Sequence, residues 1–317
     1  MLLKVSKIRK EGDNQFVLRN INFTQKKLQK IAIVGETGSG KSTLLKIISG
    51  LVQQEKGEVW LDKEKVKGPS EKLVPGHASI AYLSQYFELQ KFLTVEQILT
   101  YANLLSQKEA NALYEICQID HLLQRKTDQL SGGEKQRIAM ARLLISSPKL
   151  LLLDEPFSHL DMVHKSTLKS VIDAISQKLN ITCILVSHDP SDTLSWADKI
   201  LVMKEGEIVQ EGTPQQVYRQ PINEYVAGLF GKYTVMTTAL AKTFLVEPSV
   251  RAKKMFLRPE DFAIVEKGET TPKAKVERVN FFGGYSELDV VLSKIEITVR
   301  TEKRKIKPGD KIYLTMY

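Results

Sequence analysis

The stretch from Gly35 to Ser42, Gly-Glu-Thr-Gly-Ser-Gly-Lys-Ser, constrains the fold of this chain more than any other. An apolar run at 31–34 precedes it and is typical of a buried strand, and apolar residues at helical spacing follow it up to Gly50. Strand, glycine-rich loop and helix in this order predict backbone N–H groups gathered around an anion at a helix N-terminus. The residues predicted to bind nucleotide phosphates are Gly35, Glu36, Thr37, Gly38, Ser39, Gly40, Lys41, Ser42 and Thr43.

Two carboxylates follow a second apolar run further along the chain. Four leucines at 150–153 predict a central strand, and Asp154 and Glu155 stand at its carboxyl end, where parallel α/β sheets bind their ligands. We expect Asp154 to hold Mg²⁺ together with the Ser42 hydroxyl, and Glu155 to polarise the attacking water. A further strand at 181–187 ends in His188, which is expected at the same edge and is assigned a catalytic role.

A second anion-binding surface is predicted at Ser131, Gly132, Gly133 and Glu134. The serine and two glycines open an amphipathic helix, so that free N–H groups and a small hydroxyl lie at its start. This surface cannot serve the phosphate in the first loop from the same side. We therefore expect the nucleotide to be enclosed between two copies of the chain.

The length predicts about two domains, and the composition is ordinary for a soluble globular protein. Of the 317 residues 42% are hydrophobic, yet no run approaches the roughly 18 apolar residues of a membrane span, and the N-terminus lacks a signal-peptide pattern. Cys117 and Cys183 lie in apolar contexts and are expected to be buried free thiols. Residues 94–117 read as helical, and alternating residues in the first 30 positions read as antiparallel strands.

In their order and spacing, these motifs resemble the ABC ATPases over residues 1–231. The resemblance implies an α/β P-loop NTPase with a RecA-like core, an antiparallel β subdomain and a helical subdomain, using ATP and Mg²⁺. It also implies that Gln85 contacts Mg²⁺, that residues 131–134 contact the nucleotide of the opposite subunit, that Asp161 belongs to the D-loop, and that His188 lies near the γ-phosphate.

Four positions depart from the pattern of that family. The usual adenine-stacking aromatic position falls near Arg9, and Phe16 is the nearest aromatic; stacking by Phe16 and simple core packing both remain open. Glu134 stands where importers often have Gln, and His159 where Ala is usual. Residues 88–93 replace a common Pro-His pattern in a segment that faces the membrane partner in the family.

The tail at 232–317 changes to short alternating strands with turns at 283–284 and 307–310, which predicts a small all-β domain of the OB kind. Two motifs, Arg258-Pro-Glu-Asp and Phe281-Phe-Gly-Gly, resemble the accessory TOBE domain of importers of sugars, polyamines, ferric iron, sulfate and molybdate. The junction at 221–231 resembles theirs as well. A small anion could be sensed by this tail, but no group of residues supports one.

The sequence is consistent with two alternative functions. The first is the ATPase subunit of an ABC importer for a small ion or solute, peripheral at the cytoplasmic side of the cell membrane. Its partners would be a second copy of the chain, permease subunits and an extracytoplasmic substrate-binding protein, with no nucleic acid expected. The alternative is a soluble ABC ATPase that acts on nucleic acid or ribosomes through the tail. The sequence after Gly231 contains 17 basic and 11 acidic residues. One ATPase cassette, no long coiled coil and no interleaved basic and aromatic residues favour the importer.

Overall fold

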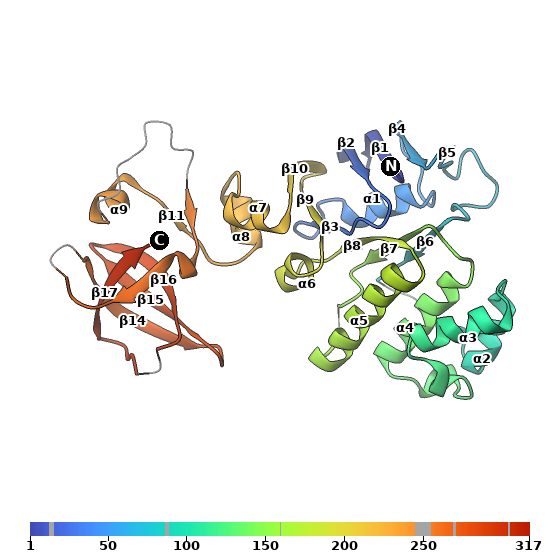
Figure 1. The fold of residues 1–317 in the computed structure, drawn as a ribbon. Coiled ribbons are helices and arrows are strands. Elements are labelled where there is room, and N and C mark those ends of the chain that lie inside the picture. Colours follow the sequence, from blue (N-terminus) through green and yellow to red (C-terminus); the bar gives the residue numbers. More distant parts are fainter. Residues whose placement is uncertain (13–15, 86–88, 159, 245–254, 269–270, 304) are drawn as a thin grey trace. The chain divides into compact units, whose positions relative to one another are not determined.

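The structure is a computed structural model that describes residues 1–12, 16–85, 89–158, 160–244, 255–268, 271–303 and 305–317. Contacts within the chain define two units, Met1–Pro214 and Gln215–Tyr317, and each is described by itself. Figure 1 shows their elements along the chain.

A six-stranded sheet organises the first unit. Its order is β10 (Glu207–Gly212), β9 (Lys199–Lys204), β3 (Ile31–Val34), β8 (Thr182–Val186), β7 (Leu150–Asp154) and β6 (Ile80–Leu83); only β10 runs antiparallel. Because side chains alternate between the two faces of a strand, the leucines of β7 serve two cores. Leu150 and Leu152 enter one core, whereas Leu151 and Leu153 enter the other. Burial on both faces explains why the first four residues of β7 are all leucine.

The first core lies between the six-stranded sheet and an antiparallel sheet. That sheet has the order β2 (Phe16–Gln25), β1 (Leu3–Glu11), β4 (Lys56–Leu61) and β5 (Glu64–Lys65). Helix α1 (Lys41–Ile48) buries Leu44, Leu45, Ile47 and Ile48 in this core. The predicted strands of the first 30 residues and the predicted helix after the phosphate loop are confirmed.

Helices cover the other face of the six-stranded sheet around the second core. They are α2 (Val95–Ala102), α3 (Gln107–Ile116), α4 (Gly132–Leu144) and α5 (Met162–Lys178), with short 3₁₀ turns η1 (Asp120–Leu122) and η2 (Thr127–Gln129). The continuous helix predicted from 94 to 117 is divided in two. Ser106 begins α3 with its own capping box to Glu109, which favours a new helix start at that residue. Both cysteines are buried free thiols, as predicted.

The described residues of the second unit form the predicted β structure and three helices. Its five-stranded antiparallel sheet has the order β13 (Phe262–Val265), β17 (Lys311–Met316), β14 (Lys273–Phe281), β15 (Ser286–Leu292) and β16 (Ile295–Thr301). A separate strand pair joins β11 (Thr234–Val235) to β12 (Phe256–Leu257), and turn η3 is Pro259–Asp261. Strand β13 and helix α9 (Thr238–Thr243) were not predicted from the sequence.

Helices α7 (Pro214–Arg219) and α8 (Glu224–Leu229) are tied to the second unit by Arg258. Its side chain is 1% exposed, and its guanidinium donates to the carbonyl oxygens of Tyr218 (3.1 and 3.3 Å), Ala227 (2.9 Å), Gly231 (3.2 Å) and Lys232 (3.2 Å). This network explains why the boundary between the two compact units falls after Pro214 in the sequence, before the predicted boundary at Gly231. Gly231 as the functional boundary between residues 1–231 and 232–317 stays a prediction.

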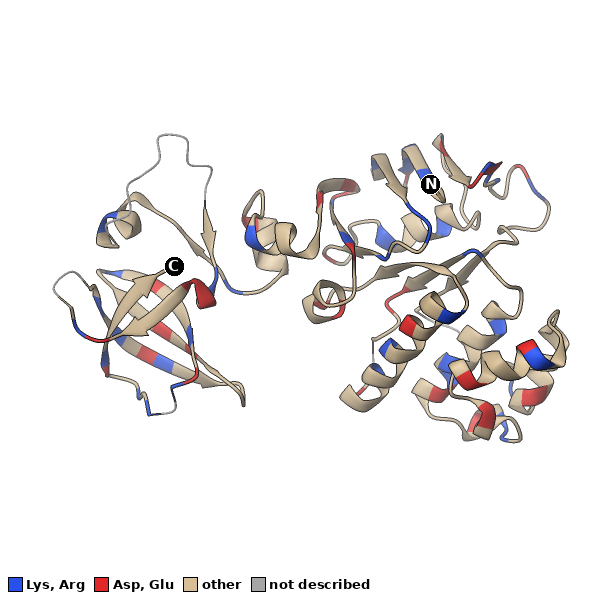
Figure 2. Cartoon of the chain, in the orientation of Figure 1, with Lys and Arg blue, Asp and Glu red and all other residues tan. Residues whose placement is uncertain are grey.

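Basic and acidic residues are interspersed along the chain of the second unit (Figure 2). Lys232 pairs with Glu287 and Asp289, Lys275 with Glu277, and Arg300 with Glu287. These basic side chains therefore have acidic partners, while the excess of basic over acidic residues after Gly231 remains. Within the described ranges, no helix has both the length and the apolar character needed to cross a membrane.

Candidate nucleotide-binding and catalytic site

The glycines of the phosphate loop occupy positions that other residues could not adopt without strain. A Cβ atom at Gly35 would lie 2.3 Å from the carbonyl oxygen of Met203, and one at Gly40 would lie 2.7 Å from that of Val17. Gly40 is also the residue before α1 and has a φ of 97°, in the left-handed region. The chain can therefore turn tightly into the N-terminus of α1, as an anion-binding loop requires.

Lys41 lies at the start of α1 and is folded back over the loop. Its Nζ donates to the carbonyl oxygens of Gly35 (2.8 Å) and Glu36 (2.7 Å) and to the hydroxyl of Ser39 (3.4 Å). Burial lowers the pKa of Lys41, and the nearby carboxylates Glu155 and Asp154 oppose that effect. The ammonium group is thus held at the loop where the phosphates of a nucleotide are expected.

Asp154 joins the phosphate loop to the end of β7. Its Oδ1 accepts a 3.0 Å hydrogen bond from the Ser42 hydroxyl, and its Oδ2 accepts one of 2.8 Å from the Tyr82 hydroxyl. Hydroxyl and carboxylate oxygens are suitable Mg²⁺ ligands, and Mg²⁺ typically takes one or two protein oxygens together with substrate phosphates. Among the described residues, no group of three His, Cys, Asp or Glu is placed to hold a metal ion by itself. The donor set fits Mg²⁺.

Tyr82 is a site residue that the sequence analysis missed. It lies on β6, whose parallel register places it opposite Leu152 of β7, two residues before Asp154. Burial and the neighbouring Asp154 raise the pKa of the Tyr82 hydroxyl, so it stays protonated and able to donate.

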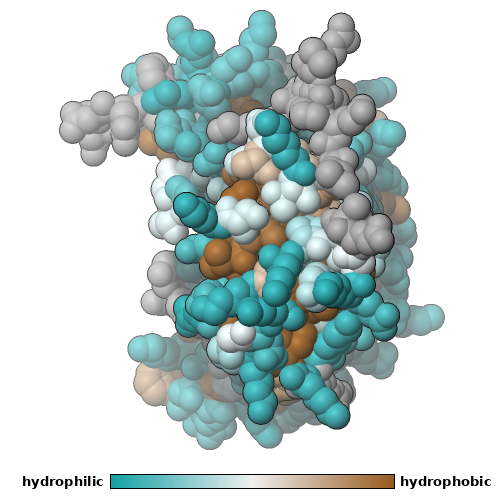
Figure 3. All heavy atoms as spheres, turned by 90° about the vertical axis from the view of Figure 1, so that its left-hand side faces the viewer, coloured by the Kyte–Doolittle hydropathy of each residue, from teal (hydrophilic) through white to brown (hydrophobic). Residues whose placement is uncertain are grey.

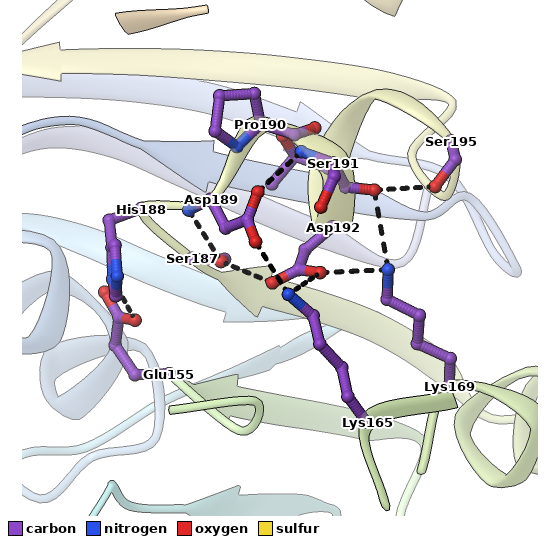
Figure 4. Close-up of polar contacts among 11 residues, drawn as sticks. Glu155, Lys165, Lys169, Ser187, His188, Asp189, Pro190, Ser191, Asp192 and Ser195 are labelled. Atoms are coloured by element: carbon purple, nitrogen blue, oxygen red, sulfur yellow. Dashed lines mark hydrogen bonds and ion pairs between the residues drawn. The ribbon is translucent and has the colours of Figure 1, made fainter. Parts of the chain in front are cut away.

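Glu155 and His188 lie against each other at the carboxyl ends of β7 and β8 (Figure 4). His188 Nδ1 is 2.7 Å from Oε2 of Glu155. The Glu155 backbone has a φ of 51°, and its N–H donates to the carbonyl oxygen of Val186 (3.0 Å). The Glu155 side chain is 14% exposed, whereas that of His188 is 68% exposed. A carboxylate oriented by an imidazole at a strand end is an arrangement suited to activating water.

Residues 131–134 form a capped helix start. The Ser131 hydroxyl accepts from the Glu134 N–H (3.3 Å), and the Glu134 carboxylate accepts from the Ser131 N–H (2.8 Å). Burial would raise the pKa of Glu134, but these bonds and the nearby Arg125 and Arg137 outweigh it and lower the pKa. Gly132 is exposed at the first turn, and a Cβ there would meet open space. The start of α4 is thus accessible, and its contact with a second subunit stays a prediction.

Asp161 caps α5 and connects it to α4. Its carboxylate accepts from the His164 N–H (2.9 Å) and lies 2.8 Å from His164 Nδ1. The His164 ring in turn lies so close to Gly133 that a Cβ there would be 2.9 Å from it. Gln136 of α4 also donates to the carbonyl of Pro156, directly after Glu155. The predicted D-loop and the predicted opposite-subunit surface are therefore neighbours within one chain.

Three further positions from the sequence analysis are Gln85, Phe16 and His159. Gln85 follows β6 and lies near the sheet edge that bears Asp154, partly exposed. The side chain of Phe16 and the whole of His159 lie outside the described residues, so stacking of Phe16 on adenine stays a prediction.

The second unit has a pocket with both basic and acidic side chains in its lining. Figure 3 shows apolar side chains between hydrophilic ones on the exposed face of this unit. The pocket lining includes Arg300 and Lys303, but also Glu260 and Glu302. The guanidinium of Arg300 lies 4.2 Å from the ring centre of Tyr285. Because acids and bases balance in the lining, its charge does not select an anion.

Comparison with known proteins identifies the family of the chain. The family model described as ABC transporter matches residues 18–158. The chain is 33% identical to a sulfate/thiosulfate import ATP-binding protein of Mesostigma viride, across 95% of this chain and 90% of the relative. It is 32% identical to a spermidine/putrescine import ATP-binding protein of Mycoplasma mycoides subsp. mycoides, across 92% and 89%.

Solved structures agree with the fold. CbiO1 from Clostridium perfringens, described as part of an ABC transporter complex, aligns with a TM-score of 0.60 at 28% identity, covering 68% of this chain and 90% of that one. The ATP-binding cassette MJ0796, solved as a dimer in a post-hydrolysis state with ADP and Pi, aligns with a TM-score of 0.57 at 27% identity, covering 67% and 99%.

Proposed function

Because this chain belongs to the ABC transporter family of ATP-binding proteins and is an ATPase that uses ATP and Mg²⁺, we propose that it drives the import of a small ion or solute. The observation that carries the catalytic part is the contact between Glu155 and His188, beside the Ser42–Asp154 bond. The family relationship extends over 95% of the chain, so it includes the second unit as well as the ATPase core.

In this proposal, each group at the sheet edge has its own role in hydrolysis. The loop from Gly35 to Thr43 and the Lys41 ammonium bind the phosphates, and Ser42 and Asp154, with Gln85, would hold Mg²⁺. Bound there, Mg²⁺ would supply neutralisation of charge on the phosphate oxygens. Glu155 accepts a proton from the attacking water, and His188 orients Glu155 and contacts the γ-phosphate side of the site.

We further propose that two copies enclose ATP, with Ser131, Gly132, Gly133 and Asp161 of one copy facing the nucleotide of the other. The exposed helix start at Gly132 supports this arrangement. Closure on ATP and opening after hydrolysis would then move the attached permease subunits.

Exposed apolar side chains in the helical region support contact with a permease. Phe92, Tyr101 and Leu104 are 74%, 76% and 83% exposed, and they follow the Gln85 segment. We place the protein at the cytoplasmic side of the cell membrane, held there by permease subunits and working with an extracytoplasmic substrate-binding protein. The two relatives are named for sulfate/thiosulfate, which is anionic, and for spermidine/putrescine, which is cationic. A polyamine, ferric iron, sulfate or molybdate therefore all remain within the proposed substrate class.

The alternative function, an ATPase acting on nucleic acid or ribosomes, has no support in these comparisons.

Affinity capture from detergent-solubilised membranes tests the proposal. The full chain is captured at moderate salt, and its partners are identified by mass spectrometry. Recovery of a polytopic permease, and of a solute-binding protein, is expected. Recovery of ribosomes or nucleic acid from the soluble fraction, without a permease, would overturn the import function. In parallel, Lys41→Ala should lose nucleotide binding, with Lys46→Ala in the same helix as the control.

A further inference from the structure

The segment that carries His188 is held by an ion-pair cluster on α5. Lys165 Nζ lies 2.6 Å from Asp189 Oδ2 and 2.8 Å from Asp192 Oδ1, and Lys169 Nζ lies 2.9 Å from the same Asp192 atom. Figure 4 shows both lysines reaching from α5 towards helix α6 (Pro190–Leu194). The Asp192 side chain is only 2% exposed. A buried carboxylate with two lysine partners fixes the position of the two elements it joins.

The cluster holds the backbone on both sides of His188. Before it, the Ser187 hydroxyl donates to Asp192 Oδ2 (3.2 Å). After it, the Asp189 N–H donates to the Ser187 hydroxyl (3.1 Å), and the Asp189 carboxylate accepts from the Ser191 N–H (2.9 Å). Each of these hydrogen bonds includes Ser187 or Asp189, the two residues that flank His188.

His188 itself has little packing to orient it. Its side chain is 68% exposed, and its contact with Glu155 reaches across from a different strand. The direction of the imidazole therefore depends on the backbone at 187–189. Lys165 connects that backbone to α5 through its ion pair with Asp189. Lys165 lies one helical turn after Asp161, and its N–H donates to the Asp161 carbonyl oxygen (2.9 Å).

We propose that Lys165 and Asp192 are positioning residues that hold His188 against Glu155 and couple it to the Asp161 end of α5. The proposal rests on the proposed ATPase chemistry of Glu155 and His188. Neither residue reaches the phosphate loop in the contacts described, so their loss should affect turnover and leave nucleotide affinity unchanged. If the cluster only stabilised the fold, its loss would change turnover and nucleotide affinity together, or would change neither of them.

The test uses Lys165→Met, Asp192→Asn, the double variant and the conservative Lys165→Arg in the full-length chain. Each single variant should lower kcat by roughly 10- to 100-fold, since a displacement of about 1 Å in a catalytic group costs up to that much. KM for ATP and the Kd for a fluorescent ATP analogue should stay within about twofold of wild type, because the phosphate loop is untouched. The double variant should be no slower than the singles, and Lys165→Arg should restore most of kcat. Lys178→Met, an exposed lysine at the far end of α5, is the matched control.

A second readout does not depend on turnover. The imidazole Cε1–Hε1 resonance of His188, assigned by its loss in His188→Gln, should shift or broaden in Lys165→Met and stay unchanged in Lys178→Met. Unchanged kcat together with an unchanged His188 resonance would overturn the positioning role, as would a parallel loss of kcat and ATP affinity. If wild type hydrolyses no ATP, the proposed function fails, and the His188 resonance still decides the positioning role.

Should Lys165→Met fail to fold, Ser187→Ala keeps every charge and removes the hydroxyl that links Asp189 to Asp192. It should lower kcat by about threefold to tenfold with ATP affinity retained, in proportion to one lost hydrogen bond. A wild-type kcat in that variant would count against the proposal.

Discussion

The hydroxyl of Tyr82 donates a 2.8 Å hydrogen bond to the carboxylate of Asp154, which is only 4% exposed. Asp154 is therefore held from two sides, by Tyr82 of β6 and by Ser42 of α1. A buried carboxylate needs such donors, and the tyrosine leaves the other oxygen close to the phosphate loop.

We expect Tyr82→Phe to destabilise the chain by about 1–3 kcal/mol, because Asp154 Oδ2 would lose a donor while remaining buried. Denaturant unfolding measures this change. Tyr114→Phe, which alters a buried tyrosine in the helical core, serves as the matched control and should cost less. Equal losses in the two variants would mean that the Tyr82 bond contributes nothing specific.

The same bond predicts a loss of stability at alkaline pH. Burial and Asp154 raise the pKa of Tyr82, whereas a tyrosine in the unfolded chain titrates near about 10. The contribution is therefore complete below about pH 10 and falls as the pH rises above it, since only the unfolded chain releases the proton. Unfolding curves from pH 8 to 11 should show a steeper decline for wild type than for Tyr82→Phe. Parallel curves would rule this explanation out.

Glu155→Gln should keep ATP binding and lower turnover by about 10²- to 10⁴-fold, because the amide cannot accept a proton from water. With ATP and Mg²⁺ the variant should accumulate as a closed dimer, detectable by size-exclusion chromatography with light scattering. Glu115→Gln, an exposed carboxylate on α3, is the control and should keep most of its activity. Substantial hydrolysis by Glu155→Gln would assign the general base to another group.

Asp189 predicts a loss of stability in acid. Burial alone would raise its pKa, but the hydrogen bonds from Lys165 and Ser191 lower it to about 2. A depressed pKa stabilises the fold above the unfolded value of about 3.9. That contribution is lost as the pH falls from about 4 towards 2. Asp189→Asn should flatten the acid unfolding profile in this range, and the exposed Asp120→Asn should not. A wild-type profile in Asp189→Asn would refute the role of this carboxylate.

Arg258→Met should destabilise the second unit by at least about 2 kcal/mol, because the buried Ala227 carbonyl and the partly buried Tyr218 carbonyl would both lose a charged donor. Arg219→Met is the matched change. The Arg219 side chain is 59% exposed in its pair with Asp261, so its loss should cost less than about 1 kcal/mol. Thermal unfolding followed by calorimetry separates the two cases. Similar melting temperatures for both variants would show that the Arg258 network is not a stabilising one.

The elements that bear the site could be predicted because each has a strong local pattern. The glycines of the phosphate loop, the four leucines before Asp154 and the strand before His188 each define their own structure. Parallel pairing of β6, β7 and β8 then brings their carboxyl ends together at one edge of the sheet.

What could not be predicted depends on contacts between distant segments. Tyr82 resembles any strand tyrosine until the register of β6 on β7 is known. Lys165 and Lys169, four residues apart on a helix, have the pattern of a solvated face, yet both meet the buried Asp192. Ser106 and Glu109 form a capping box that marks the start of α3 in the sequence. The apolar periodicity continues across this position and predicted one helix instead of two.

The Arg258 network also bears on how such chains can recombine. A crossover between two relatives at Gly231 would combine an arginine from one parent with helices α7 and α8 of the other, whose packing sets where the main-chain carbonyl groups of Tyr218 and Ala227 lie. A crossover at Pro214 would transfer the arginine and its acceptors together. Functional hybrids selected from a shuffled library should therefore have their junctions concentrated before α7, and the accessory unit should be inherited as a module of 103 residues, Gln215–Tyr317.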